Sequence, residues 1–113
     1  MVNRPWVPRP SELVRINFNP IAGHEQANVR PAVVLSAQGF NDKSDLLVCV
    51  PCTTKIKGHP FEVAIAGLTE PSVALSHHIR TLDWRQRQAV SIGFAAADEM
   101  AEIRQKIQAL LGI

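Results

Sequence analysis

The sequence predicts a single, mainly β domain that ends in one α-helix. A length of 113 residues suffices for one hydrophobic core but not for two. Short apolar or alternating segments recur up to residue 94, as in β-strands, whereas from Ala97 onward apolar residues recur at helical spacing. Many short strands and one terminal helix favour a strongly bent sheet or open barrel whose apolar face the helix covers. We expect residues 1–113 to form this one domain.

Five or six short strands are expected before the helix. The segments 32–35 and 46–50 are continuous apolar runs, which favours strands buried on both faces. Three other segments alternate apolar and polar residues and predict strands with one buried face. Their apolar positions are Val14, Ile16 and Phe18, then Phe61, Val63 and Ile65, and finally Val90, Ile92 and Phe94. A brief strand is expected at 73–75, a polar loop at 21–30 and a turn at 39–45.

The predicted C-terminal helix is amphipathic. Its apolar positions are Met100, Ile103, Ile107, Leu110 and Leu111. Asp98 is expected to cap its N-terminus and Gly112 to end it. Glu102 and Lys106 stand one turn apart on the polar side, where an ion pair would stabilise the helix modestly.

Composition and charge narrow the class of protein. The 46% hydrophobic and 19% charged residues are typical of a globular domain and not of a disordered chain. The sequence lacks both an apolar run of the roughly 18–20 residues that span a bilayer and the apolar segment of a secretion signal, so we expect a cytosolic protein without a membrane partner. A net charge of +2 is compatible with nucleic-acid binding. Two basic clusters, at 55–59 and 80–87, are expected to converge in a folded barrel.

The sequence shows no spacing that indicates a metal site. Cys49 and Cys52 have CxxC spacing but lie at a predicted strand, where side chains three positions apart face opposite sides. Since there is no second cysteine pair, we interpret both as reduced residues of the core. His77 and His78 are adjacent on a predicted edge strand and therefore also point to opposite faces. We expect neither a metal nor a cofactor.

The loop before the second strand holds the best candidates for acid–base chemistry. It brings together His24, Glu25, Gln26 and Arg30. Metal-free RNA cleavage, in which the ribose 2′-hydroxyl attacks the neighbouring phosphorus, needs a proton acceptor, a proton donor and cationic donors for the phosphorane oxygens. Glu25, His24 and Arg30 can supply these three functions. A solvated loop with Arg30 in a salt bridge explains the same residues.

Other candidates lie at predicted strand ends and turns. Thr53, Thr54 and Lys55 offer two hydroxyls and an ammonium group to a phosphate, although threonines at a strand end also fit a simple turn cap. His77 can face a phosphate with Arg80 beside it, or remain an exposed histidine of an edge strand. Trp84, in a predicted helical turn, can stack on a base, but a lone tryptophan more often packs in the core or at a subunit boundary.

Seven segments of the chain resemble the MazF/PemK/Kid family of toxins. They are NP at 19–20, GHEQ at 23–26, RPAVVLS at 30–36, FN at 40–41, VPCTT at 50–54, GHPFEV at 58–63 and RTLD at 80–83. They follow the family's order and spacing over nearly the whole chain. The VPCTT segment is most similar to the MazF branch.

This resemblance implies a fold, an activity and partners. The fold is an SH3-like barrel, shared by CcdB-type and PemK-type toxins, that pairs as a two-fold homodimer with single-stranded RNA in grooves at the subunit boundary. The activity is that of a sequence-specific endoribonuclease, which cleaves mRNA to a 2′,3′-cyclic phosphate and a 5′-hydroxyl without metal or cofactor and so inhibits translation and growth. The implied partner is a cognate, MazE-like antitoxin of a type II system, and we expect it to bind through an acidic disordered segment.

The resemblance also assigns residues. Arg30 and Thr53 fall on the family's principal catalytic positions, Glu25 on a position important for activity and His24 on one that stabilises the reacting phosphate. Further RNA contacts are expected from Phe18, Gln26, Asn41, Thr54, Lys55, Lys57, Phe61, His77, Arg80 and Arg87.

One departure from the family pattern affects the chemistry. Many members carry an Asp-Gln pair where this chain has His77-His78. In some members that aspartate is proposed as the general base, and this role does not transfer. Glu25 or His77 would have to accept the proton of the 2′-hydroxyl.

Two further departures lie near the ends of the chain. Ser11-Glu12 replaces the usual Gly-Asp or Gly-Glu before the first strand, which changes a turn. The final residues at 111–113, Leu-Gly-Ile, faintly resemble the Trp-Gly-Ile end of the gyrase-poisoning CcdB toxins. A CcdB-like gyrase inhibitor is therefore one alternative function. The other is a barrel that binds RNA or a partner without catalysis, which the His77-His78 substitution makes possible.

Overall fold

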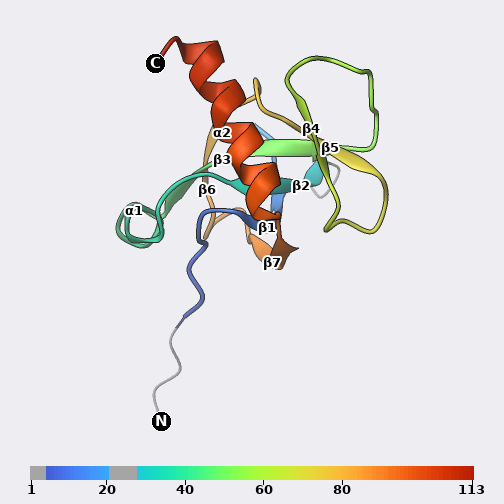
Figure 1. Ribbon diagram of the computed structural model, residues 1–113. Coiled ribbons are helices and arrows are strands. Elements are labelled where there is room, and N and C mark those ends of the chain that lie inside the picture. The colour runs from blue at the N-terminus through green and yellow to red at the C-terminus, as the bar shows by residue number, and fades with distance from the viewer. Residues whose placement is uncertain (1–4, 21–27) are drawn as a thin grey trace.

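The computed structural model describes residues 5–20 and 28–113, which form a curved antiparallel sheet with one long helix across it (Figure 1). The strands in this part of the chain are β1 (Glu12–Asn17), β2 (Val29–Val34), β3 (Leu46–Thr53), β4 (Glu62–Ile65), β5 (Ser72–Leu75), β6 (Arg80–Asp83) and β7 (Val90–Phe94). The helices are α1 (Gln38–Ser44) and α2 (Ala97–Leu111). The predicted class, mainly β with a C-terminal helix, is confirmed. No helix among these residues is long and apolar enough to cross a membrane.

Strand β3 is the hub of the sheet. It pairs with β2 along one edge and with β6 and then β5 along the other. From there β2 leads to β1 and β7, and β5 leads to β4. All of these pairings are antiparallel. The last residues of β3 lie between β2 and β5, because Pro51 pairs with β2 while Cys52 and Thr53 pair with β5. Strand β6 was not predicted, because its residues, Arg-Thr-Leu-Asp, show no clear alternation of apolar positions.

The curved sheet separates two hydrophobic clusters, because neighbouring residues of a strand point to opposite faces. Leu13 and Val14 of β1 are both fully buried but belong to different clusters. The first cluster is closed by Met100 and Ile103 of α2, and the second contains Trp84. The helix therefore covers one face of the sheet, as the sequence predicts, and Trp84 is a core residue.

Cys49 and Cys52 show the strand geometry that their spacing predicts. Both are buried free thiols, and they lie in opposite clusters. Burial raises the pKa of each thiol to about 12, so both remain protonated at neutral pH. Their interpretation as reduced core residues is confirmed.

The alternating pattern is a poor guide to burial in β1 and β7. In β1 only Arg15 is exposed, while Asn17, on the predicted polar face, is buried. In β7 Val90 is 59% and Phe94 46% exposed, and of the three predicted apolar positions only Ile92 packs against a core cluster. Both predictions of a half-buried strand are wrong in detail. Strand β1 contributes side chains to both hydrophobic clusters, whereas β7 is an edge strand that pairs with β1.

Two predicted boundaries are also wrong. The segment expected to turn at 39–45 forms helix α1, which ends at Asp45 in a left-handed conformation with φ of 61°. Because Gly39 and Asn41 are weak helix formers, contacts with the rest of the fold decide this helix. The loop expected at 21–30 ends earlier, since Val29 and Arg30 belong to β2. Residues 21–27 lie outside the described residues.

Helix α2 matches its predicted range, but its predicted N-cap is wrong. Ala96, and not Asp98, is the N-cap residue, and the carboxylate of Glu99 accepts the N–H groups of Ala96 and Ala66. Gly112 ends the helix in a left-handed conformation, as expected. The predicted pair Glu102–Lys106 is present at 3.0 Å. In the last turn of the helix, the predicted apolar positions Leu110 and Leu111 are exposed.

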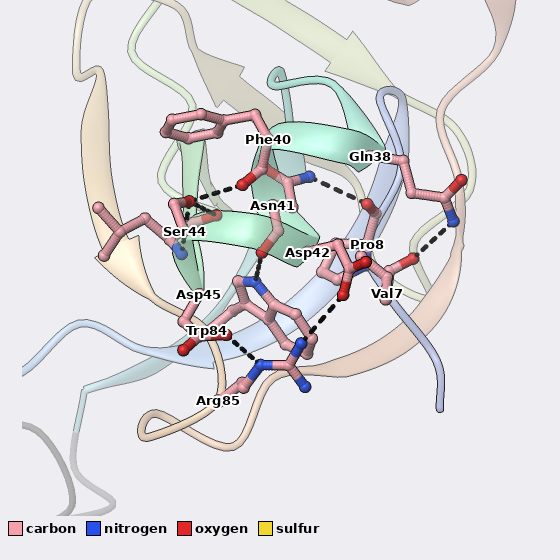
Figure 2. Close-up of polar contacts among 11 residues, drawn as sticks. Val7, Pro8, Gln38, Phe40, Asn41, Asp42, Ser44, Asp45, Trp84 and Arg85 are labelled. Carbon is pink, nitrogen blue, oxygen red and sulfur yellow. Dashed lines mark hydrogen bonds and ion pairs between the residues drawn. The ribbon is translucent and has the colours of Figure 1, made fainter. Parts of the chain in front are cut away.

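Asn41 organises the contacts around α1 (Figure 2). It is fully buried, and its side-chain amide donates to the carbonyl oxygens of Pro8 at 2.9 Å and Ser36 at 3.2 Å. Its own carbonyl accepts from the indole Nε1 of Trp84 at 2.9 Å. Asn41 therefore joins the N-terminal segment, α1 and the second cluster, and its expected contact with RNA is wrong because the side chain is inaccessible.

We predict that Asn41→Ala lowers the free energy of unfolding by about 2–4 kcal/mol, because it leaves buried carbonyl groups without a donor. Urea denaturation would measure the change. Asp42→Ala is the matched control on the same helix, where loss of the exposed ion pair with Arg85 is expected to cost about 0–1 kcal/mol. Equal destabilisation by the two substitutions would contradict this account of Asn41.

Candidate functional site

A cavity of about 240 Å³ lies where β2, the end of β3 and the segments around β4 and β5 meet. It is lined by Arg30, Thr53, Lys55, Lys57, His59, Glu62, Leu75, His77 and His78. Two hollows adjoin it through shared residues. One, of about 370 Å³, shares Arg30 and His77 and adds Phe18 and Arg80, and the other shares Arg30 and Thr53 and adds Thr54. Arg30 lines all three spaces.

Arg30 projects from β2 opposite Ile16 of β1. Its Nε donates a hydrogen bond to Oδ1 of Asn28 at 2.9 Å, which orients the guanidinium group. Within residues 5–20 and 28–113 no carboxylate forms an ion pair with Arg30. The alternative interpretation, in which Arg30 serves a salt bridge, has no support in this part of the chain. A guanidinium group held in this way can compensate negative charge on a bound phosphate.

Thr53 is the last residue of β3 and pairs with Val73 of β5. Its Oγ1 accepts the backbone N–H of Lys55 at 3.1 Å. Thr53 therefore both caps the turn that follows β3 and lines the cavity. Because a hydroxyl accepts and donates at the same time, the Thr53 O–H can still be directed to a phosphate oxygen.

The loop between β3 and β4 is fixed by the carboxylate of Glu62. Its two oxygens accept the backbone N–H groups of Lys57 at 3.1 Å and Gly58 at 3.0 Å. Gly58 has φ of +78°, a conformation that favours glycine. Lys106 of α2 donates to the backbone carbonyl of Glu62 at 2.9 Å, which ties the loop to the helix. These contacts hold Lys57 and His59 at the rim of the cavity.

Three histidines and a phenylalanine form one aromatic group at this rim. The rings of His59 and His77 are stacked, with centroids 4.3 Å apart and an angle of 7° between their planes. His78 meets His77 edge-on at 4.3 Å, and Phe61 lies 5.7 Å from His77. His77 and His78 belong to the connection between β5 and β6, so their placement on an edge strand is wrong.

The environment of His77 disfavours its charged form. Burial is the largest cause that lowers its pKa below 6.5, followed by the neighbouring His78 and His59, while Glu62 acts weakly in the opposite direction. Its Nδ1 is buried and has no hydrogen-bond partner among the described residues. The imidazolium form would carry an unpaired N–H at that atom, so geometry and charge both favour a neutral ring.

Two arginines of the predicted basic cluster at 80–87 lie away from the cavity. Arg87 donates to the carbonyl oxygens of Asn17 and Asn19, and it lines a separate hollow with Arg15. Arg85 pairs with Asp42 of α1 and with Asp45, which follows that helix, and its guanidinium lies over the ring of Trp84, as Figure 2 shows. The expected convergence of the two basic clusters is therefore incomplete.

The other predicted site residues are either buried in the core or outside the described part of the chain. Phe18 is a core residue, only 5% exposed, with the guanidinium of Arg80 5.7 Å from its ring. His24, Glu25 and Gln26 lie outside the described residues. From the sequence, His59 was predicted only as part of a basic cluster, and Glu62 was not predicted as a site residue. The turn residues on either side of His59, a glycine and a proline, were the available signal for a shaped loop.

The cavity combines cationic groups, a hydroxyl and imidazoles, which is the donor set of a phosphate-binding acid–base site. Among the described residues, no three His, Cys, Asp or Glu side chains are grouped so that they could hold a metal ion.

Comparison with known proteins identifies close relatives. Residues 9–111 match the model of a family described as PemK-like, MazF-like toxin of type II toxin-antitoxin system. The endoribonuclease toxin MazF of Escherichia coli K12 is 44% identical over 112 residues, which cover 99% of this chain and all of that protein.

Solved structures give the same result. The crystal structure of MazF from Deinococcus radiodurans matches with a TM-score of 0.87 and 45% identity, covering 96% of this chain and 100% of that one. A crystal structure of MazE–MazF from the same organism matches with a TM-score of 0.84 and 40% identity, covering 96% and 99%. The fold of the single chain that the resemblance implies is thereby confirmed, a curled antiparallel sheet with a C-terminal helix.

We predict that the imidazole of His77 titrates below pH 6.5 and is neutral at pH 7. Titration followed by NMR of the histidine ring signals would measure this. His78→Asn, which removes a neighbouring group that becomes positive, is expected to raise the pKa of His77 toward 6.5. A His77 pKa at or above 6.5 in the unmodified protein would contradict the prediction.

Proposed function

The chain belongs to the PemK-like, MazF-like toxin family of type II toxin–antitoxin systems, and from this premise we propose how it acts as an endoribonuclease. Its substrate is single-stranded mRNA in the cytoplasm, and cleavage at specific short sequences inhibits translation and growth. The observation that carries the proposal is the cavity that Arg30, Thr53 and two lysines line together with His77. Burial lowers the pKa of this histidine, which favours its neutral form. The alternative of a gyrase inhibitor finds no support among relatives named as endoribonucleases.

The proposed reaction requires only groups of the chain and the RNA. The ribose 2′-oxygen forms a bond to the adjacent phosphorus while the bond from phosphorus to the 5′-oxygen breaks. The proton of the 2′-hydroxyl passes to a base, and the leaving 5′-oxygen receives a proton. Arg30 donates this proton or stabilises the charged phosphorane, and Thr53 holds the scissile phosphate by its hydroxyl. The products are a 2′,3′-cyclic phosphate and a 5′-hydroxyl.

Two groups are candidates for the base. His77 lines the cavity with Arg30, and its lowered pKa leaves it able to accept a proton at neutral pH. Glu25 precedes β2 in the sequence and is the other candidate. His24 is proposed to stabilise the reacting phosphate.

The RNA is proposed to follow the basic residues on either side of the cavity. Lys55 and Lys57 line the cavity itself, Thr54 the hollow on one side and Arg80 the hollow on the other. Phe18 supports Arg80 from the core, while Phe61 and Gln26 are proposed as further contacts. The path does not extend to Asn41, which is buried, or to Arg87, which the backbone carbonyls of residues 17 and 19 hold.

We propose that the antitoxin closes this basic path. MazE–MazF structures among the relatives indicate a MazE-like partner. An acidic segment that is disordered in the free antitoxin would be drawn to Arg30, Lys55 and Lys57 and would fold over the cavity, so that antitoxin and RNA exclude one another.

We predict that Arg30→Ala lowers the rate of RNA cleavage by about 10²- to 10³-fold, because developing phosphorane charge loses its donor. The assay uses purified protein, single-stranded RNA and EDTA. Arg30→Lys is expected to restore little activity, since an ammonium group lacks the two-pronged geometry of guanidinium. Arg104→Ala, on the exposed side of α2, is the control and should cleave as the unmodified protein does. Normal turnover in folded Arg30→Ala would remove Arg30 from the mechanism.

We predict that the pH–rate profile identifies the base. If His77 accepts the proton, activity falls as the pH drops through its lowered pKa, because only the neutral ring is active. His77→Asp should still cleave, and the loss of activity should move to the range of an aspartate, near pH ~4. Identical profiles for the two proteins would exclude His77 and leave Glu25 as the base.

We also propose a homodimer, because the single chain exposes large apolar side chains at β7 and at the end of α2. These include Val90 at 59%, Leu111 at 56% and Ile113 at 81% exposure. A domain of this size gains stability when association buries such surface. Analytical ultracentrifugation at micromolar concentration should give twice the mass of the 12.4 kDa chain. A monomer that still cleaves RNA would contradict the proposal.

A further inference from the structure

His59 is an exposed aromatic side chain whose orientation is nevertheless fixed. One face of its ring is stacked on His77 at 4.3 Å. Its Nδ1 accepts the backbone N–H of Phe61 at 3.1 Å. The loop that carries it is held by the carboxylate of Glu62, which accepts two backbone N–H groups just before His59. The ring is therefore ordered before any ligand binds.

The hydrogen bond from Phe61 also fixes which ring nitrogen of His59 carries the proton. Nδ1 is an acceptor in this contact, so the neutral ring carries its hydrogen on Nε2. His59 consequently offers a flat aromatic face and one N–H donor at its edge. It lines the same cavity as Arg30 and Thr53.

Proteins bind single-stranded RNA by combining a cationic groove with aromatic rings on which unpaired bases stack. The cationic part of the cavity is supplied by Arg30, Lys55 and Lys57. The aromatic part is the stack of His59 on His77, supported by Phe61. A preordered ring loses little entropy when a base stacks on it, which makes such a position more effective than a freely rotating side chain.

We propose that His59 is a base-stacking residue, on which an unpaired nucleobase next to the scissile phosphate extends the stack of His59 on His77. This inference rests on the proposed function and adds to it the group that positions the substrate's base. Because every base has an aromatic face, His59 contributes affinity and position, whereas the edges of the base are read by other groups.

The test combines variants of His59 with RNA that lacks one base at a time. Unmodified protein first cleaves a single-stranded RNA, which maps the cut site. A short RNA with that site, blocked at the scissile 2′-oxygen by methylation, is then prepared intact and with an abasic nucleotide at each position in turn. Binding of the labelled RNA is measured by fluorescence anisotropy.

His59→Ala should weaken binding of the intact RNA by about 5- to 150-fold, the usual range for loss of one base stack. At one position beside the blocked phosphate, the abasic RNA should bind the unmodified protein as weakly as His59→Ala binds intact RNA, and His59→Ala should suffer no further loss there. His59→Phe keeps a flat ring and should bind within about threefold of the unmodified protein. Ile56→Ala, in the same loop but outside the cavity lining, is the control and should bind normally.

Salt dependence separates stacking from charge. Loss of a stack releases no counterion, so His59→Ala should bind more weakly at every salt concentration with an unchanged slope of log K against log salt. Lys57→Ala, which removes a phosphate contact, should make that slope shallower by about 0.7. A slope change in His59→Ala equal to that of Lys57→Ala would overturn the stacking role.

The outcomes distinguish the inference from the function on which it rests. If the unmodified protein cleaves RNA but folded His59→Ala binds it equally well, the inference is wrong and the proposed function stands. The inference is also wrong if the abasic positions affect both proteins alike. If the unmodified protein neither binds nor cleaves RNA, both are wrong.

Discussion

The structure depends on an interruption in the pairing along one edge of β3. Cys49 and Cys52 are three positions apart on that strand, but their partners Arg80 and Ala74 are six positions apart. The chain between these two partners therefore carries three more residues than the part of β3 that it faces, and it leaves the ladder as a bulge. Pro51, which has no N–H to donate, stands at the interruption. The bulge places His77 and His78 beside the cavity, and bulges of this kind commonly direct side chains into sites.

The same strand sets the other half of the site. As β3 passes from its pairing with β2 to its pairing with β5, its last residue, Thr53, comes to lie beside Arg30 of β2. Both residues sit at the ends of paired strands, so backbone hydrogen bonds fix their positions. The loop residues His59 and Lys57 are fixed instead by a single carboxylate, that of Glu62. The site thus joins groups carried by the sheet to groups carried by an ordered loop.

This arrangement explains what the sequence predicted well. Continuous apolar runs at β2 and β3 reflect burial on both faces, and the spacing from residue 97 reflects the one face of α2 that meets the sheet. Thr53 and Lys55 stood out as a hydroxyl and a cation at the end of a buried strand, Arg30 as a cation just before one, and Lys57 as part of a basic cluster. Their meeting in one cavity is visible only in the fold.

The elements that the sequence did not predict depend on distant contacts. Helix α1 contains weak helix formers, and the buried Asn41 stabilises it through bonds to Pro8 and Trp84. The bulge before β6 has no periodicity to detect, and the stack of His59 on His77 requires two segments that are far apart in sequence. The apolar positions of β7 were predicted to be buried. Alternation identifies the apolar face of a strand, but it does not show whether another element covers that face.

A neutral histidine in a cationic cavity has a consequence for the chemistry. Arg30, Lys55 and Lys57 favour a bound phosphate, but the same positive charge would make a carboxylate a weaker base by stabilising its ionised form. Neighbouring positive charge lowers the pKa of an imidazole as well, and the pKa of His77 is lowered by burial first and then by His78 and His59. The difference is that the proton-accepting form of an imidazole is neutral, whereas that of a carboxylate is an anion. The change from the Asp-Gln pair of many family members to His77-His78 therefore alters the charge of the site by removing an anion from the phosphate's surroundings. His77 can therefore accept a proton there without repelling the negatively charged phosphate. Its stacking contact with His59 holds the imidazole ring in position.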